Sequence, residues 1–142
     1  LLGCKTNRTA HQFEDRSPRS IEIVPGQDSM ASRVMTLRGI TAETANYQTL
    51  KTLYEYETDP RVRQELVLTL SRIGGDSSYS IIEKALLDSN AKVRMLAVNA
   101  AARIGGKKAK RDISRVASTD EEASVKNLAS ARLESLVEAP TQ

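Results

Sequence analysis

The chain has 142 residues, of which 39% are hydrophobic and only 4% aromatic, and its formal net charge is +3. This length allows one domain with short tails, and the mildly basic balance lacks the concentrated charge of nucleic-acid-binding proteins. No run of about twenty apolar residues is present, so the sequence predicts no membrane-spanning helix.

The first four residues, Leu1-Leu2-Gly3-Cys4, precede a polar segment. They resemble the lipobox of bacterial lipoproteins, where a leucine stands three residues before, and a glycine directly before, the cysteine that receives the lipid. The resemblance implies that Cys4 is acylated, and two or three acyl chains anchor a protein stably. We therefore expect the protein to lie in the bacterial periplasm and to be anchored by lipid to a membrane, with the outer membrane as the first choice. The alternative is a cytoplasmic protein whose Cys4 carries no lipid.

Residues 1–28 are predicted to form a tether or arm. Within this arm, Ile21 to Pro25 alternates like a short strand that ends in a proline-glycine turn. We expect Ile21 and Ile23 to lie on the helical domain or to extend a partner's sheet; the alternative is a flexible linker. His11, the only histidine, has no second strong ligand beside it, and a single cysteine builds no cysteine site. The sequence thus predicts no metal site and no cofactor.

From Ser29 onward the apolar residues follow helical periods, and a repeat of 31 residues appears. The sequence DPRVRQELVLTLSRIGG at residues 59–75 returns as NAKVRMLAVNAAARIGG at residues 90–106. A weaker third copy, one residue late, includes Val125 and Leu128. A period of this length is typical of stacked repeat proteins.

About seven helices in antiparallel pairs are expected. Residues 29–58 are predicted to form a degenerate pair that caps the stack, because solenoids need a polar outer face at each end. Its two helices run from Ser29 to near Gly39 and from Thr44 to Thr58. The repeats occupy residues 59–138, and residues 139–142 form a tail.

Local signals set the helix boundaries inside the repeats. Asp59 and Asn90 are predicted N-caps, and the Gly-Gly pairs are predicted to end the long helices, because glycine accepts positive φ. After the first pair, Asp76 is expected to restart a shorter helix. Thr119 with Glu122 has the spacing of a capping box.

The succession of an acidic residue, Val-Arg, Leu and Ala at helical spacing, and Ile-Gly-Gly resembles the HEAT repeat in its short form, the PBS-lyase HEAT-like repeat. The resemblance covers about residues 58–137. It implies an all-α fold, a right-handed α-solenoid of short helical pairs behind a mostly irregular N-terminal arm. The third copy departs from the pattern, with Lys126 in place of arginine and no Gly-Gly, as suits a terminal repeat.

Acidic and basic residues recur at fixed positions of the repeat. The acids, five residues before each repeat's valine, are Glu57, Asp88 and Asp120, and the bases, one residue after it, are Arg63, Arg94 and Lys126. We expect these side chains to form a structural ladder of charge-assisted hydrogen bonds between neighbouring repeats. The same regularity argues against a catalytic role for these acids.

The densest charge lies on the predicted helix from Lys107 to about Ser118. Lys108, Arg111 and Arg115 share one face of it, and Lys84 stands at the equivalent of Arg115 in the preceding repeat. We call these four residues the basic stripe. In HEAT-like stacks the second helix of each pair lines the concave surface, so the stripe is expected on the inner face. There it would bind an anionic partner, namely an acidic protein surface, a phosphate backbone or lipid headgroups. The alternative is a solvated face balanced by Asp112 and Glu83.

Tyr79, which starts a helix just before Ile81 and Ile82, is the aromatic residue that we expect at the partner-binding surface. Apart from Tyr79, aromatic side chains that could stack on bases are missing from the basic region, so nucleic acid ranks last among the partners. A nucleophilic relay is also not predicted, because no histidine stands near a serine or cysteine.

The sequence therefore predicts a non-catalytic scaffold or adaptor for protein–protein interaction, a lipid-anchored component of a bacterial envelope assembly. The first alternative is a soluble fragment or subunit of a cytoplasmic HEAT-like scaffold. The second is an enzyme subunit of the bilin-lyase type, because some HEAT-like proteins attach bilins to phycobiliproteins. The expected partner is another protein with an acidic surface, within a larger complex.

Overall fold

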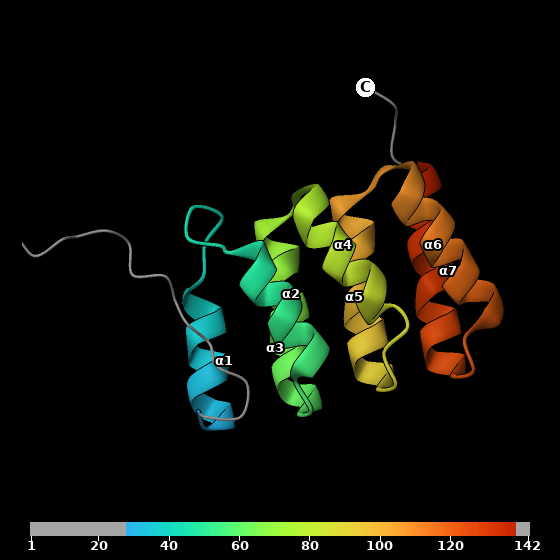
Figure 1. Ribbon diagram of the computed structural model, residues 1–142. Coiled ribbons are helices and arrows are strands. Elements are labelled where there is room, and N and C mark those ends of the chain that lie inside the picture. Colours follow the sequence, from blue (N-terminus) through green and yellow to red (C-terminus); the bar gives the residue numbers. More distant parts are fainter. Residues whose placement is uncertain (1–27, 139–142) are drawn as a thin grey trace, which may run out of the picture.

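The computed structural model describes residues 28–138, and within this range the chain forms only α-helices, seven in all (Figure 1). They are α1 (Met30–Gly39), α2 (Tyr47–Tyr56), α3 (Pro60–Ile73), α4 (Gly75–Ala85), α5 (Ala91–Ile104), α6 (Gly106–Thr119) and α7 (Ala123–Glu138). The all-α solenoid is confirmed. Cys4, His11 and the segment from Ile21 to Pro25 lie outside the described residues, so their roles stay predictions.

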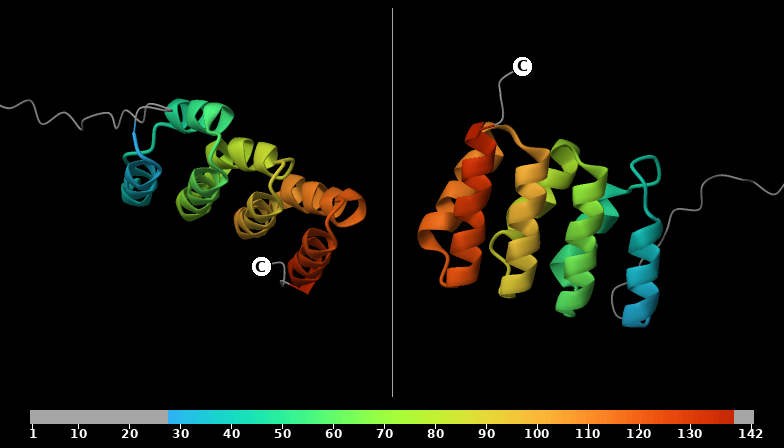
Figure 2. Two further views of the ribbon diagram at one scale, coloured as in Figure 1. Left: turned by 90° about the horizontal axis from the view of Figure 1, so that it is seen from below. Right: turned by 180° about the vertical axis from the view of Figure 1, so that it is seen from behind.

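The helices form two layers, which the left view of Figure 2 shows end-on. In one layer α1, α3, α5 and α7 each pack on the next, whereas α2, α4 and α6 of the other layer are farther apart. The stack bends toward the odd-numbered layer, so the even-numbered helices lie on its outer side. The predicted inner position of the basic helix is therefore wrong. The inner layer includes α3 and α5, the two helices that carry Val-Arg, and small buried residues such as Ala97, Ala100 and Ala101 let α5 approach its neighbours closely.

The core is one continuous apolar layer between the two rows of helices. α3 buries Val62, Leu66 and Leu70 as predicted, and it also buries Val67 and Thr69. The additional burial arises because α3 lies between α1 and α5 as well as against α4. Since each helix covers only its neighbours, no pair has a closed core of its own, and the repeats stabilise one another.

Polar side chains fix where the helices begin. Asp59 Oδ1 accepts the Arg61 amide at 2.9 Å, and Asn90 Oδ1 accepts the Lys92 amide at 3.0 Å, so both predicted N-caps are confirmed. Equivalent bonds satisfy orphan amides of α1 and α2, whose N-caps are Ser29 and Asn46. The second helix is therefore shorter than predicted, because its cap lies after Thr44.

The predicted capping box at Thr119 is not formed. Thr119 is the last residue of α6, and its hydroxyl donates to the Arg115 carbonyl at 2.9 Å. Its helical position leaves no oxygen free to face the start of α7. Asp120 takes over the role, because its Oδ1 accepts the Glu122 amide at 2.9 Å.

The Gly-Gly pairs make sharp corners between the two layers. Gly74 and Gly105 have φ of +75° and +77°, and the following Gly75 and Gly106 have +81° and +89°. An L-residue with a side chain rarely adopts these angles, whereas glycine does so readily. Each pair ends one helix and starts the next at once, so α4 begins at Gly75 and not at the predicted Asp76.

Candidate functional site

Three arginine–carboxylate pairs connect neighbouring repeats along the stack. The pairs are Arg33 with Glu57, Arg63 with Asp88, and Arg94 with Asp120, and their Nε–oxygen distances are 2.7, 2.8 and 2.8 Å. In each pair a second guanidinium nitrogen binds the other carboxylate oxygen, at 2.9 to 3.2 Å. This bidentate geometry fixes direction as well as distance. We call the three pairs the ladder.

Each ladder arginine also holds the loop in front of its own helix. Arg94 Nη1 donates to the carbonyls of Asp88 and Ser89 at 2.9 and 3.3 Å, and Arg63 Nη1 does the same with the carbonyls of Glu57 and Thr58. One guanidinium thus ties two loops together. The ladder is nearly saturated with internal partners, and its role is to set the angle between repeats.

One ladder residue, Arg33, was not predicted, and one predicted residue, Lys126, does not pair. Arg33 lies 24 residues before its acid, whereas Arg63 and Arg94 lie 25 and 26 residues before theirs. That spacing was a usable signal, but Ser32 stands where the repeats have valine. Lys126, at the arginine position of the last repeat, makes no ion pair with any residue between 28 and 138.

The ladder lowers the pKa of two of its carboxylates, Asp88 and Asp120. Burial raises the pKa of Asp88, but hydrogen bonds from Arg63, Tyr54 and the Asn90 amide outweigh it and hold the pKa below its usual value. The pKa of Asp120 is lowered in the same way, since bonds from Arg94 and the Glu122 amide exceed the opposing effect of burial. Both carboxylates are therefore ionised at neutral pH, as their arginine partners require.

The basic stripe is divided by its contacts into a paired half and a free half. Lys84 bonds Glu55 on α2, and Lys108 bonds Glu83 on α4, so these two lysines connect successive outer helices. Arg111 and Arg115 lie only within 3.7 and 3.9 Å of one shared oxygen, Asp112 Oδ1, beyond hydrogen-bonding distance. Arg111 is 72% exposed and Arg115 48% exposed at the side chain, so both guanidinium groups face solvent.

Tyr79 is buried, not displayed at the surface as predicted. It is 6% exposed, and its hydroxyl donates to Asp112 Oδ2 at 2.8 Å. Burial and this contact with the Asp112 carboxylate raise the pKa of the phenol. Tyr79 and Ile82 of α4, three residues apart, lie on the buried face of this helix, which Leu86 directly after the helix continues, and this explains the burial. The Lys108 ammonium covers the ring, 5.3 Å from its centroid.

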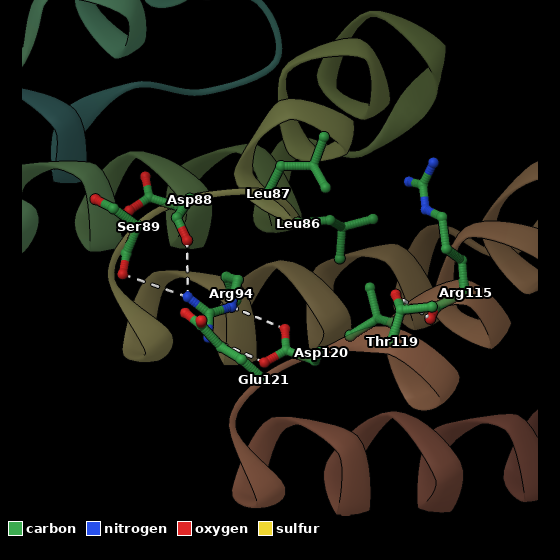
Figure 3. A pocket seen from close by; sticks show the side chains of 10 residues that line it. Leu86, Leu87, Asp88, Ser89, Arg94, Arg115, Thr119, Asp120 and Glu121 are labelled. Atoms are coloured by element: carbon green, nitrogen blue, oxygen red, sulfur yellow. Dashed lines mark hydrogen bonds and ion pairs between the residues drawn. The ribbon is translucent and has the colours of Figure 1, made fainter.

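Beside the free half of the stripe lies an open pocket of about 320 Å³ (Figure 3). Its apolar wall comes from Leu86 and Leu87 after α4 and from Val116 of α6, and Arg115 stands at its edge. Leu87 is 71% exposed, whereas Leu86 and Val116 are buried behind it. The pocket therefore combines one accessible apolar side chain, Leu87, with an accessible cation, Arg115.

The described part of the chain offers little support for other kinds of site. No group of three or more metal-ligating side chains gathers among residues 28–138. In the same range, none of the helices has the length and apolar character needed to cross a bilayer.

A family model for HEAT repeats matches residues 47–134, which is more than half of the chain. The chain belongs to the HEAT-repeat family. No curated protein and no solved structure gives a significant match. HEAT repeats in general serve as non-catalytic scaffolds for protein–protein interaction, so the family supports another protein as the partner. The fold alone does not identify that partner.

Proposed function

We propose that this HEAT-repeat protein is a non-catalytic scaffold that binds an acidic surface of another protein through the outer face of α6. The observation that carries the proposal is the charge of this helix, which holds five basic residues and one acid. The basic residues are Lys107, Lys108, Lys110, Arg111 and Arg115, and the acid is Asp112, which is 3% exposed.

Positive charge on the outer layer is concentrated on its last helix, α6, whereas α4 carries the two acids Asp76 and Glu83 and the single base Lys84. On α2 and α4 the lysines Lys51 and Lys84 are accompanied by the acids Glu55 and Glu83. α6 has no such balance, and Lys107 and Lys110 form no ion pair with any described side chain. A surface of this kind attracts an oppositely charged partner and raises the rate of encounter.

A rigid framework supports the proposal. The ladder fixes the angle between α3, α5 and the following turn, so the outer helices keep their relative positions without a ligand. Preformed surfaces bind with a smaller loss of conformational freedom than surfaces that must first be ordered. A fixed row of charges is therefore suited to a scaffold.

Affinity capture with the whole chain as bait tests this proposal. The double substitution Arg111→Glu and Arg115→Glu should abolish capture of the partner and leave the helical content unchanged, because both side chains are exposed. The matched control is Lys92→Glu with Arg103→Glu, which reverses two exposed cations of α5 in the other layer. Unchanged capture by the first variant would exclude the stripe, and the arm around Ile21 and Ile23 would be tested next.

We also propose that Cys4 is acylated and anchors the scaffold to a bacterial envelope membrane, preferably the outer membrane. The support is the sequence Leu1-Leu2-Gly3-Cys4 alone. Intact-mass analysis of the protein from its native cell would detect the added acyl mass, and Cys4→Ser should release the protein from the membrane fraction. An unmodified Cys4 would favour the cytoplasmic alternative.

A further inference from the structure

Two successive repeats differ at the same position of their outer helices. In the first, Lys84 reaches Glu55, which lies 29 residues earlier on the preceding outer helix. In the next, Arg115 occupies the position of Lys84, but 29 residues earlier the chain has Leu86 in place of an acid. The acid that would neutralise Arg115 is replaced by an apolar side chain, and the pocket of Figure 3 lies at this position.

Of the remaining charges of the pocket, Glu121 is exposed, whereas the others are already occupied. Arg94 gives two hydrogen bonds to Asp120 and two to loop carbonyls, and Asp88 accepts bonds from Arg63 and Tyr54. These groups have little capacity for a ligand. What the pocket offers is the apolar wall of Leu86, Leu87 and Val116, together with the Arg115 guanidinium.

We propose that this pocket binds a peptide segment of the partner, in which an apolar side chain stands next to an aspartate or glutamate. The apolar side chain packs on Leu87 and enters the pocket, and the neighbouring carboxylate binds Arg115. The proposal rests on the protein-binding function proposed above and adds the chemistry of the recognised segment.

The dimensions and charges of the pocket fit such a segment. A volume of about 320 Å³ is at the lower end of ligand sites and admits an apolar side chain. Burial of Leu87 against that side chain removes apolar surface from water, and a guanidinium binds a carboxylate with two hydrogen bonds. The exposed carboxylate of Glu121 on the opposite rim repels anions, a chain of phosphates more than a single carboxylate, so the acid of the segment binds on the Arg115 side.

A second exposed apolar residue extends the same edge of the stack. Tyr56 is 69% exposed and stands directly before the ladder acid Glu57, as Leu87 stands directly before Asp88. Equivalent positions of successive repeats follow one another along a solenoid. An extended peptide that enters the pocket can therefore continue toward Tyr56.

The first experiment selects random twelve-residue peptides that bind the whole chain, with each peptide displayed as an insert fused at both ends to a carrier protein. The best peptide is then labelled with fluorescein, and its binding is measured by fluorescence anisotropy. We expect selected peptides to carry an apolar residue next to an acid. Leu87→Ser and Arg115→Gln should each weaken binding about tenfold, and added salt should weaken it too. The matched controls are Leu68→Ser and Arg103→Gln, an exposed leucine and an exposed arginine of the other layer, and they should bind as the wild type does.

Selected peptides without acids, or binding that Leu87→Ser leaves unchanged, would overturn this proposal. A labelled single strand of twenty nucleotides that binds with the same dependence on Arg115, while no peptide is selected, would do so as well. Capture of the native partner distinguishes a failure of the pocket proposal from a failure of the scaffold function. If the chain captures the partner and Leu87→Ser does not reduce capture, the pocket proposal is wrong and the scaffold function stands; if no partner is captured at all, the scaffold function fails.

Discussion

Arg94 connects three segments of the chain through one guanidinium, which binds Asp120 and the carbonyls of Asp88 and Ser89. Arg94→Met would leave the Asp120 carboxylate, 5% exposed, without its counter-charge. We expect the free energy of unfolding to fall by on the order of 3 kcal/mol. Removal of one partner of a buried ion pair leaves the other charge buried without a counter-charge. Urea denaturation measures the loss.

The control is Arg103→Met, because Arg103 is an exposed arginine of the same helix. An exposed substitution of this kind should change the free energy of unfolding by no more than about 0.5 kcal/mol. Equal losses in both variants would show that the effect comes from α5 itself and not from the ladder.

The ladder carboxylates also make stability depend on pH. Asp88 and Asp120 have lowered pKa values in the folded protein, so their contribution is complete above the unfolded value of about 3.9 and is lost as pH falls through the lower folded value. We expect the urea midpoint to be level from about pH 7 to 5 and to decline below about pH 4. In the double variant Asp88→Asn, Asp120→Asn, stability at pH 7 should be lower and the acid decline shallower. An unchanged decline would assign acid sensitivity to other groups.

The ladder shows which contacts sequence reasoning can reach. Acids and arginines recur at regular spacing, which predicted bonds between neighbouring repeats without assigning the pairs; the structure pairs Arg63 with Asp88. Tyr79 was mispredicted although helical spacing with Ile82 places it on the buried face of α4, because its position at the start of the helix was taken as a sign of exposure. The pocket was equally hidden, since it arises from the juxtaposition of Leu87, in the turn after α4, and Arg115 on α6.

At the corner between α5 and α6, two glycines in succession have positive φ. Gly105→Ala would place an L-residue at φ +77°, although its Cβ would meet no atom within 4 Å. The expected loss of about 1–2 kcal/mol therefore comes from the backbone and not from a clash. Thermal denaturation, followed by circular dichroism, measures the shift.

Gly39 provides the comparison for this prediction. It ends α1, its φ lies outside the positive range, and an added Cβ would also have free space. Gly39→Ala should thus be neutral or raise stability by about 0.5 kcal/mol, because alanine loses less conformational freedom on folding. A loss as large as that of Gly105→Ala would contradict the role given to φ.

The boundaries of helices followed from sequence where a cap is chemically specific, as at Asp59 and Asn90. They were wrong where two signals compete. Thr119 has a capping side chain, but Asp120 is one residue closer to α7 and already oriented by Arg94, so it makes the bond to the Glu122 amide. Which layer lies inside was also mispredicted, because curvature depends on how closely the helices of each row approach, a property of the stack and not of one helix.

The stack as a whole should open from its ends. Each repeat is stabilised by its neighbours only, and α3 and α5 have odd-numbered neighbours on both sides, whereas within the described residues α1 and α7 each have one. We expect hydrogen–deuterium exchange, followed by mass spectrometry, to be fastest in α1 and α7 and slowest in α3 and α5. Uniform exchange in all helices would mean that the stack unfolds as one cooperative unit.

The ladder predicts a further asymmetry in the same experiment. Arg94 links α5 to the turn before α7 through Asp120. At the other end, Arg33 of α1 binds Glu57, and Thr69 and Arg72 of α3 donate to carbonyls at the end of α1. Arg94→Met should therefore accelerate exchange in α7 much more than in α1, and Arg103→Met should accelerate neither. If Arg94→Met accelerated exchange equally at both ends, the ladder would act on the whole stack and not between adjacent repeats.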